Sequence, residues 1–150
     1  MTEKYEFMSS GWLNKMKEIL SGLVEKTKAE LSGVTFSLNE VFTNPPDHIV
    51  KEYPGDTASY YFRIANGELE FGKGEISNAN IKIKAPYETI KPIAMTLKAD
   101  DPTYDERIMK IFSDGAQDGT AGFYSDIKEG LKVLPEAFDE LHDLIARHTV

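Results

Sequence analysis

The dipeptide Asn66-Gly67 constrains the fold of this chain more than any other local feature. The residues on both sides of it alternate polar with apolar side chains, as expected of two half-buried strands over residues 59–65 and 68–73. A two-residue type I′ turn needs positive φ at both positions, which Asn and Gly accept readily. The sequence therefore predicts an antiparallel hairpin whose apolar side carries Tyr60, Phe62, Ile64, Leu69 and Phe71.

Two further segments repeat with a period of two. One begins at Val34 and extends to Phe42, where the Asn44-Pro45-Pro46-Asp47 run breaks it. The other covers residues 79–84, with Ile81 and Ile83 on one face and Lys82 and Lys84 on the other. We therefore expect three or four antiparallel strands between residues 34 and 84.

Helical periodicity precedes and follows these strands. A helix is predicted from Gly11 to about Glu30, ending near Gly33. A second begins at Ala85-Pro86, and Asp101-Pro102 opens a third. The three glycines and two aspartates of residues 113–122 predict irregular structure there. Residues 123–147 are expected to form two helices, or one helix kinked at Pro135.

The order helix, strands, helices is typical of an α+β fold. We predict an antiparallel sheet of four to five strands, covered on one face by helices. The chain has 150 residues and shows no repeat, low-complexity tract or interdomain linker. Residues 1–150 are therefore expected to form a single domain.

Composition excludes several classes of function. The net charge of −8, without a local basic patch, argues against nucleic-acid binding. The absence of cysteine excludes disulfides, thiolate nucleophiles and Cys-based metal sites. The sequence contains no run of about 18 apolar residues, so it predicts no membrane span. Residues 1–7 are charged and polar, so it predicts no signal peptide. We expect a cytoplasmic protein with no integral membrane association.

The residues that could carry chemistry have simpler structural interpretations. His142 and His148 do not share a helical face, which argues against a metal site. Asp47 and His48 are adjacent and have no nucleophile beside them. The carboxylates of residues 100–106 are explained by a helix start, where negative charge is stabilising, and need no catalytic role. The glycines of residues 115–122 are not followed by the Lys that a phosphate-binding loop requires. We predict no catalytic residue, no metal and no cofactor.

Three segments of the sequence resemble the sterol carrier protein type-2 family. They are Phe7-Met8-Ser9-Ser10-Gly11-Trp12-Leu13, the hairpin from Tyr60 to Glu68, and Ala79-Asn80-Ile81-Lys82-Ile83-Lys84. The resemblance covers residues 7–95. It implies a short sheet covered by helices, with a tunnel between them for fatty acids, acyl-CoA or sterols. Downstream, residues 114–122 keep the glycines of that family's last strand but not its alternating large apolar residues.

The resemblance implies that this chain binds a lipid or another apolar small molecule. The apolar side chains expected to line the cavity come from the strands and from the later helices. They are Phe36, Leu38, Phe62, Ile64, Phe71, Ile81, Ile83, Ile93, Met95, Ile108, Met109 and Phe112. A polar head would meet Arg63, Lys82, Lys84 or a tyrosine at the mouth.

Two alternatives belong to other functional classes. A small cone-shaped α+β enzyme, such as a hydratase, isomerase or hydrolase, also places a cavity over a curved sheet, and would bury two or more polar side chains in it. An accessory interaction subunit would instead offer an apolar groove to another protein. The sequence does not predict an oligomeric state or name the ligand.

Overall fold

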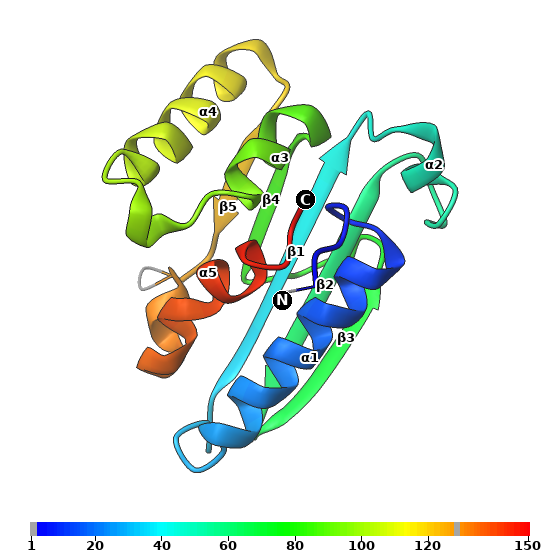
Figure 1. Cartoon of the computed structure of the whole chain (residues 1–150). Helices are drawn as coiled ribbons and strands as arrows, with labels where there is room; N and C mark the ends of the chain where they lie inside the picture. Colours follow the sequence, from blue (N-terminus) through cyan, green and yellow to red (C-terminus); the bar gives the residue numbers. More distant parts are fainter. Residues whose placement is uncertain (1–2, 128–129) are drawn as a thin grey trace.

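The structure is a computed structural model of the chain, and it describes residues 3–127 and 130–150. Figure 1 shows the arrangement of its helices and strands, in which η marks a 3-10 helix. The elements are α1 Ser10–Lys26, β1 Thr35–Thr43, α2 Asp47–Val50, β2 Ala58–Ala65, β3 Glu68–Lys73, β4 Ile81–Pro86, α3 Tyr87–Ala94, η1 Lys98–Asp100, α4 Tyr104–Asp118, β5 Gly122–Ser125, η2 Gly130–Val133, η3 Glu136–Glu140 and α5 Leu141–Ala146.

The five strands form one sheet in the order β3-β2-β1-β4-β5. β2 and β3 pair antiparallel across Asn66 and Gly67, whose φ angles are 51° and 80°, so the predicted hairpin is confirmed. β1 also pairs antiparallel with β2, and β4 with β5. β1 and β4 are parallel, however, where the sequence predicted only antiparallel pairs.

The parallel pair arises because residues 74–80 cross the sheet instead of forming a hairpin. Buried Asn39 on β1 holds this crossing segment. Its Nδ2 donates to the Gly74 carbonyl at 3.1 Å, and its Oδ1 accepts from the Ile76 amide at 3.0 Å. β4 consequently reaches the far side of β1 and runs in the same direction as β1.

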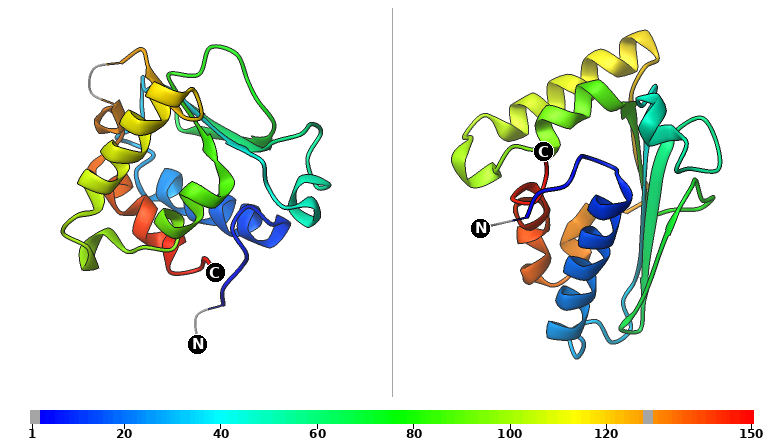
Figure 2. Two further views of the ribbon diagram at one scale, coloured as in Figure 1. Left: turned by 90° about the horizontal axis from the view of Figure 1, so that it is seen from above. Right: turned by 45° about the vertical axis from the view of Figure 1, so that its right-hand side comes forward.

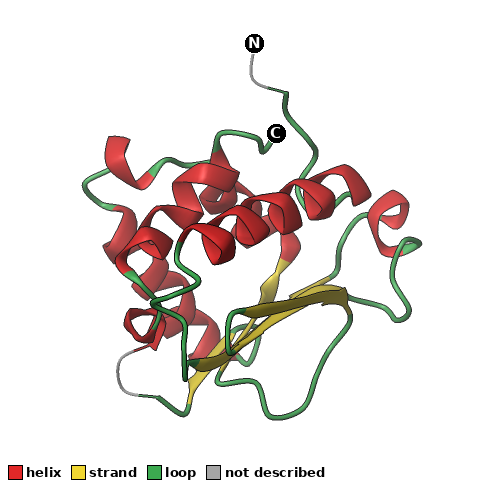
Figure 3. Ribbon diagram, turned by 90° about the horizontal axis from the view of Figure 1, so that it is seen from below, coloured by secondary structure: helices red, strands yellow, loops and turns green. Residues whose placement is uncertain are grey.

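Helices α1, α3, α4 and α5 lie on one face of the sheet (Figures 2 and 3). This confirms the predicted α+β class. The Ser9 side chain caps α1 by accepting from the Trp12 amide at 3.2 Å. One face of α1 then packs on the sheet and buries Trp12, Leu13, Met16, Leu20, Leu23 and Val24.

The first helix is shorter than its apolar pattern predicts. It ends at Lys26, where the hydroxyl of Thr27 donates to the Leu23 carbonyl in addition to the helical bond from the Thr27 backbone N–H. Such a bond from a threonine side chain competes with continued helix formation. Turns then lead to Gly33, whose φ of 77° turns the chain toward β1.

The prediction of irregular structure over residues 113–122 is wrong for most of that segment. α4 continues to Asp118 and ends at Gly119, which has the left-handed φ of 78° that a helix C-cap requires. Gly115 is the only buried residue of α4, because Ala121 packs directly against it. These glycines therefore close and pack the helix.

The prediction of helix from residue 123 onward is also wrong at its start. Residues 122–125 form β5, which pairs with β4 from Lys84↔Gly122 to Ile81↔Ser125. The strand has four residues, too few for its alternation to stand out from a helical pattern. The chain then continues through η2 and η3 to α5.

Candidate functional site

Four strands contribute one residue each to a row across the helix-covered face of the sheet. Tyr60 pairs with Glu40, Glu40 with Ile83, and Ile83 with Phe123. Paired residues of neighbouring strands point to the same face. The Tyr60 ring lies 5.8 Å from the Trp12 ring of α1, measured between centroids, so the row faces the helices.

Coverage of this face decreases along the row. Tyr60, near α1, is 2% exposed, whereas Glu40 and Ile83 are half-buried and Phe123 is 57% exposed. The part of the sheet beneath α1 is therefore a closed core. The β4–β5 part carries apolar side chains that the protein covers incompletely.

The inner face of α4 lies opposite this incompletely covered part. It consists of Tyr104, Ile108, Ile111 and Phe112, whose spacing places them on one side of a helix. The Phe112 and Phe123 ring centroids are 5.9 Å apart, so this side faces β5. All four side chains are half-buried. We call the four, together with Ile83 and Phe123, the α4–β5 face.

The structure divides the predicted cavity residues into three groups. A buried group lies within the core: Phe36, Leu38, Phe62, Ile64, Ile81 and Ile93. A half-buried group comprises Phe71, Ile83, Ile108 and Phe112. The remaining two, Met95 and Met109, are 43% and 72% exposed and lie at the surface. Three of the half-buried side chains belong to the α4–β5 face, and Phe71 stacks against Tyr60.

Glu40 places a carboxylate on the helix-covered face of the sheet, between Tyr60 and Ile83. It accepts a hydrogen bond from the Tyr60 hydroxyl. Burial raises the pKa of its carboxyl from the ordinary 4.5 to about 7, because the charged form loses hydration. Glu40 is half-buried, and its surroundings disfavour the charged form of its carboxyl.

Tyr104 of the α4–β5 face forms a hydrogen-bonded pair with His142 of α5. The Tyr104 hydroxyl lies 3.2 Å from His142 Nδ1, and His142 Nε2 lies 2.8 Å from the Thr96 carbonyl. A carbonyl can only accept, so Nε2 carries the hydrogen and Nδ1 accepts from the Tyr104 hydroxyl. Burial lowers the pKa of His142, which favours this neutral form.

Glu40 and Tyr104 interact electrostatically. Burial raises the pKa of Tyr104, and the negative charge of Glu40 raises it further. The Tyr104 hydroxyl therefore stays protonated at neutral pH.

Sequence reasoning did not single out the half-buried Glu40 or the Tyr104–His142 pair. A signal for Glu40 was present, since it occupies an inward position of β1 between Leu38 and Phe42. The pairing of Tyr104 with His142 depends on how α4 and α5 pack, which no local pattern reveals. The basic residues expected at a mouth, Arg63, Lys82 and Lys84, alternate with inward residues and lie on the opposite face.

The remaining histidines take part in surface contacts. His48 Nε2 lies 2.8 Å from Glu6 Oε1, and His148 Nδ1 lies 2.7 Å from the Glu3 carbonyl. Within residues 3–127 and 130–150, no three His, Asp or Glu side chains lie together as metal ligands would. None of the helices in that same part of the chain is long and apolar enough to span a membrane.

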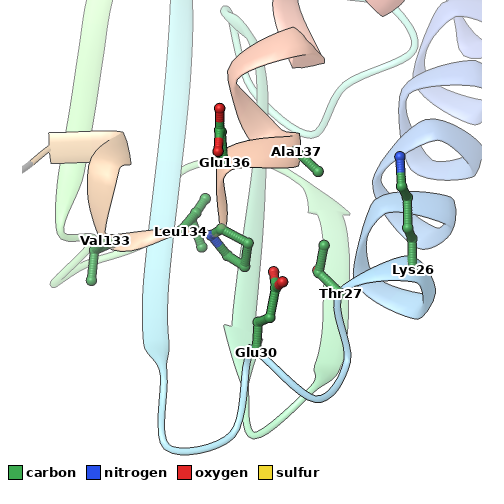
Figure 4. A pocket seen from close by; sticks show the side chains of 8 residues that line it. Lys26, Thr27, Glu30, Val133, Leu134, Glu136 and Ala137 are labelled. Atoms are coloured by element: carbon green, nitrogen blue, oxygen red, sulfur yellow. The ribbon is translucent and has the colours of Figure 1, made fainter.

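Two surface pockets lie away from the α4–β5 face. One of 460 Å³ separates the end of α1 from η2 and η3 (Figure 4), and is lined by Lys26, Thr27, Glu30, Val133, Leu134, Pro135, Glu136 and Ala137. The other, of 370 Å³, is lined by Ile76, Ser77, Asn78, Ala79, Lys82, Tyr124 and Asp126. Neither pocket contains a predicted cavity residue.

The arrangement of the strands and helices matches a solved structure over nearly its whole length. A crystal structure of sterol carrier protein 2 superposes with a TM-score of 0.51 at 15% sequence identity, covering 97% of this chain and all of that one. The chain has the sterol carrier protein 2 fold. A solution structure of a conserved hypothetical protein of Thermus thermophilus, described as a possible sterol carrier protein, gives a TM-score of 0.46 at 14% identity, covering 99% of this chain and 96% of that one. No protein-family profile and no curated protein matches the sequence.

The late strand β5 completes the sheet. It is the fifth strand and begins at Gly122, the last of the three glycines in residues 113–122. α4 lies beside β5, as the contact between Phe112 and Phe123 shows. Apart from Ile83, the α4–β5 face is thus formed by residues that follow the stretch covered by the sequence resemblance.

Proposed function

We propose that this chain is a single domain that binds an apolar small molecule against the α4–β5 face. The observation that carries the proposal is the pair of apolar surfaces that face each other there while remaining half-buried or exposed. Apolar surface removed from water contributes roughly 25 cal/mol per Å². A bound acyl chain or ring system would cover these side chains and gain that free energy.

The fold supports the same proposal. The crystal structure that this chain resembles is that of a sterol carrier protein, and the likeness extends over the entire length of that protein. A small molecule suits the site better than a partner helix. The apolar sides of α4 and β5 are in contact through Phe112 and Phe123, which leaves no room for a helix between them at that point. Fatty acyl chains and sterol-like rings both fit the chemistry of this face.

The proposal favours binding over catalysis. Both ring nitrogens of His142 are already engaged, by Tyr104 and by the Thr96 carbonyl. Burial raises the pKa of Tyr104, which opposes its use as a base. The polar pair is consequently suited to orienting a ligand.

Adjacent residues of β5 provide a matched test. Phe123 faces α4, and Tyr124 pairs with Lys82 on the opposite face, yet the two are 57% and 59% exposed. We expect Phe123→Ser to weaken binding of 1-decanol about tenfold, because a buried aromatic ring contributes at least about 1.5 kcal/mol. Tyr124→Ser should leave it within about twofold. Calorimetric titration measures both, and equal effects of the two substitutions would contradict the site.

A further inference from the structure

We propose that the chain has a second binding site, for a neutral sugar, on the face of the sheet opposite the helices. The site is the 370 Å³ pocket between the crossing segment and the β4–β5 edge, which we call the Tyr124 pocket. Lys82 and Tyr124, which line it, are paired across β4 and β5 and point away from the helices. The inference therefore goes beyond the proposed function, whose ligand lies on the other side of the sheet.

Asn80 holds the two sides of the Tyr124 pocket together. Its Nδ2 donates to Asp126 Oδ1 at 3.1 Å, and its carbonyl accepts from the Asp126 amide at 2.9 Å. Its Oδ1 accepts from the Ser37 amide of β1, also at 2.9 Å. The end of the crossing segment is thus bound both to the sheet and to the residue that follows β5. A pocket fixed in this way needs little ordering when a ligand binds, which favours affinity.

The charges around the Tyr124 pocket are balanced before a ligand arrives. Lys82 Nζ donates to Glu75 Oε2 at 2.8 Å, and this bond lowers the pKa of the Glu75 carboxyl, with a smaller effect from the Lys84 charge. Lys82 and Lys84 of β4 thus lie beside Glu75 and Asp126, so two positive charges oppose two negative charges. An anionic ligand would meet Asp126 and a cationic ligand would meet Lys82. A neutral ligand avoids both repulsions.

The lining of the pocket retains hydrogen-bonding capacity for hydroxyl groups. The Lys82 ammonium has three N–H donors and uses one of them for Glu75. Within the described residues, Asp126 Oδ1 accepts a hydrogen bond and Oδ2 accepts none. Ser77 and Asn78 are exposed, and their side chains can both donate and accept. A sugar hydroxyl also donates and accepts, so it can bond to the carboxylate and to the ammonium together.

An apolar surface completes the recognition of a sugar ring. Tyr124 is 59% exposed, and Ile76 and Ala79 add aliphatic groups to the lining. A pyranose ring has a face of C–H groups, which can cover the Tyr124 ring while its hydroxyls reach the polar groups. The volume of the pocket is near the lower end of the range of about 300–1,000 Å³ typical of small-molecule sites, which suits one sugar ring. A lipid chain would leave the polar groups without partners.

The methyl glycosides of glucose, galactose and mannose test the site, because they are neutral pyranoses without an acyl chain. We would titrate the full, isotope-labelled chain with each at neutral pH and follow the backbone amide signals by NMR. At least one glycoside should bind with a Kd of about 10 mM or below and shift the signals of residues 76–79, 82 and 124–126. The methyl glycosides of glucuronic acid and glucosamine, which carry a negative and a positive charge, should bind at least about threefold more weakly than the glucoside.

Neighbouring residues of β5 again provide matched variants. Tyr124→Ser should weaken binding of the best glycoside at least about fivefold, because the ring is lost. Lys82→Met keeps an aliphatic stem but removes the N–H donors, and should weaken binding at least about threefold. Phe123→Ser changes a side chain on the other face of the sheet and should alter glycoside binding by less than about twofold.

The outcomes separate this inference from the proposed function, because 1-decanol is titrated independently. Failure of all three neutral glycosides to bind, or signal shifts confined to other residues, would overturn the inference and leave apolar binding in place. Tighter binding of a charged glycoside, or an unchanged affinity in Tyr124→Ser, would also overturn it. If Tyr124→Ser does not fold, as judged by circular dichroism, Lys82→Met decides in its place, and an unchanged affinity in that variant would equally overturn the inference.

Discussion

The indole nitrogen of Trp12 donates a hydrogen bond of 2.9 Å to the hydroxyl of Thr149, which lies 137 positions later in the chain. The Thr149 hydroxyl in turn donates to the Ile145 carbonyl at 2.8 Å. Both residues are buried, at 3% and 2% exposure. The two ends of the chain therefore meet through a buried polar contact at the start of α1, beside the parallel bridge between Tyr5 and Thr149 (Figure 1).

Removal of the Thr149 hydroxyl should destabilise the fold. In Thr149→Val the indole N–H of Trp12 stays buried without a partner, which costs about 1–3 kcal/mol. Urea denaturation should show this loss in the free energy of unfolding. Thr35→Val, at the exposed start of β1, is the matched control and should change stability by less than about 0.5 kcal/mol. Equal effects would mean that the Trp12–Thr149 bond contributes nothing.

The buried carboxyl of Glu40 should make stability depend on pH. Its folded-state pKa of about 7 exceeds the ordinary 4.5, so the folded state binds this proton more tightly than the unfolded state. The associated stability is complete below pH 4.5 and is lost as pH rises through 7. Glu40→Gln should therefore gain stability relative to the wild type across that window, by up to about 3 kcal/mol.

Unfolding curves measured from pH 4.5 to pH 8 test this dependence. The difference in unfolding free energy between Glu40→Gln and the wild type should grow with pH. Glu68→Gln, on the exposed end of β3, should show a constant difference. Parallel curves for Glu40→Gln and the wild type would show that the Glu40 carboxyl is not perturbed by burial.

Alanine substitutions of two helical glycines should have opposite effects. A Cβ at Gly115 would overlap the Cβ of Ala121, so Gly115→Ala forces α4 away from the segment that leads into β5. Overpacking of this kind costs about 1–3 kcal/mol. A Cβ at Gly22 in α1 meets nothing within 4 Å, so Gly22→Ala should stabilise the chain by up to about 1 kcal/mol. Thermal unfolding of both variants checks the signs, and a stable Gly115→Ala would refute the close packing.

Ligand binding should slow hydrogen exchange most strongly in α4 and β5. α4 buries only Gly115 and β5 buries no residue, so both should open easily in the free protein. Saturation with 1-decanol should protect residues 104–118 and 122–125, while the short helix over residues 47–50 serves as an internal reference. Protection confined to α1 would place the ligand elsewhere.

Local sequence patterns predicted most of the fold because they reflect the backbone conformations that the residues themselves prefer. Asn66-Gly67 specifies its own turn, and the alternation on either side fixes which side chains face inward. The errors occurred where tertiary contacts decide. Gly115 favours irregular structure by its residue type, yet it lies within α4 because Ala121 occupies the space beside it. β5 was missed because a four-residue strand has almost no period of its own.

The candidate site was predicted less completely than the fold. Helical spacing places Ile108 and Phe112 on one side of α4, and Phe112 packs against Phe123. The polar groups do not follow from spacing. Glu40 and Tyr104 come from elements that pack only after the chain has crossed the sheet, so no sequence neighbourhood contains both of them.

The parallel β1–β4 pair has a consequence for how the sheet assembles during folding. β2 and β3 close over a two-residue turn, whereas Ser37 and Asn80, which are hydrogen-bonded at the start of the parallel pair, lie 43 positions apart. Pairing these residues in the unfolded chain would close a long loop at a large cost in chain entropy, whereas the formed hairpin and β1 leave only the connection between β3 and β4 to be closed. The hairpin and β1 therefore form a template on which β4 and β5 dock late. We therefore expect the half of the sheet that carries the α4–β5 face to be built last, and its sparse burial should also make it the first to open when the chain is destabilised.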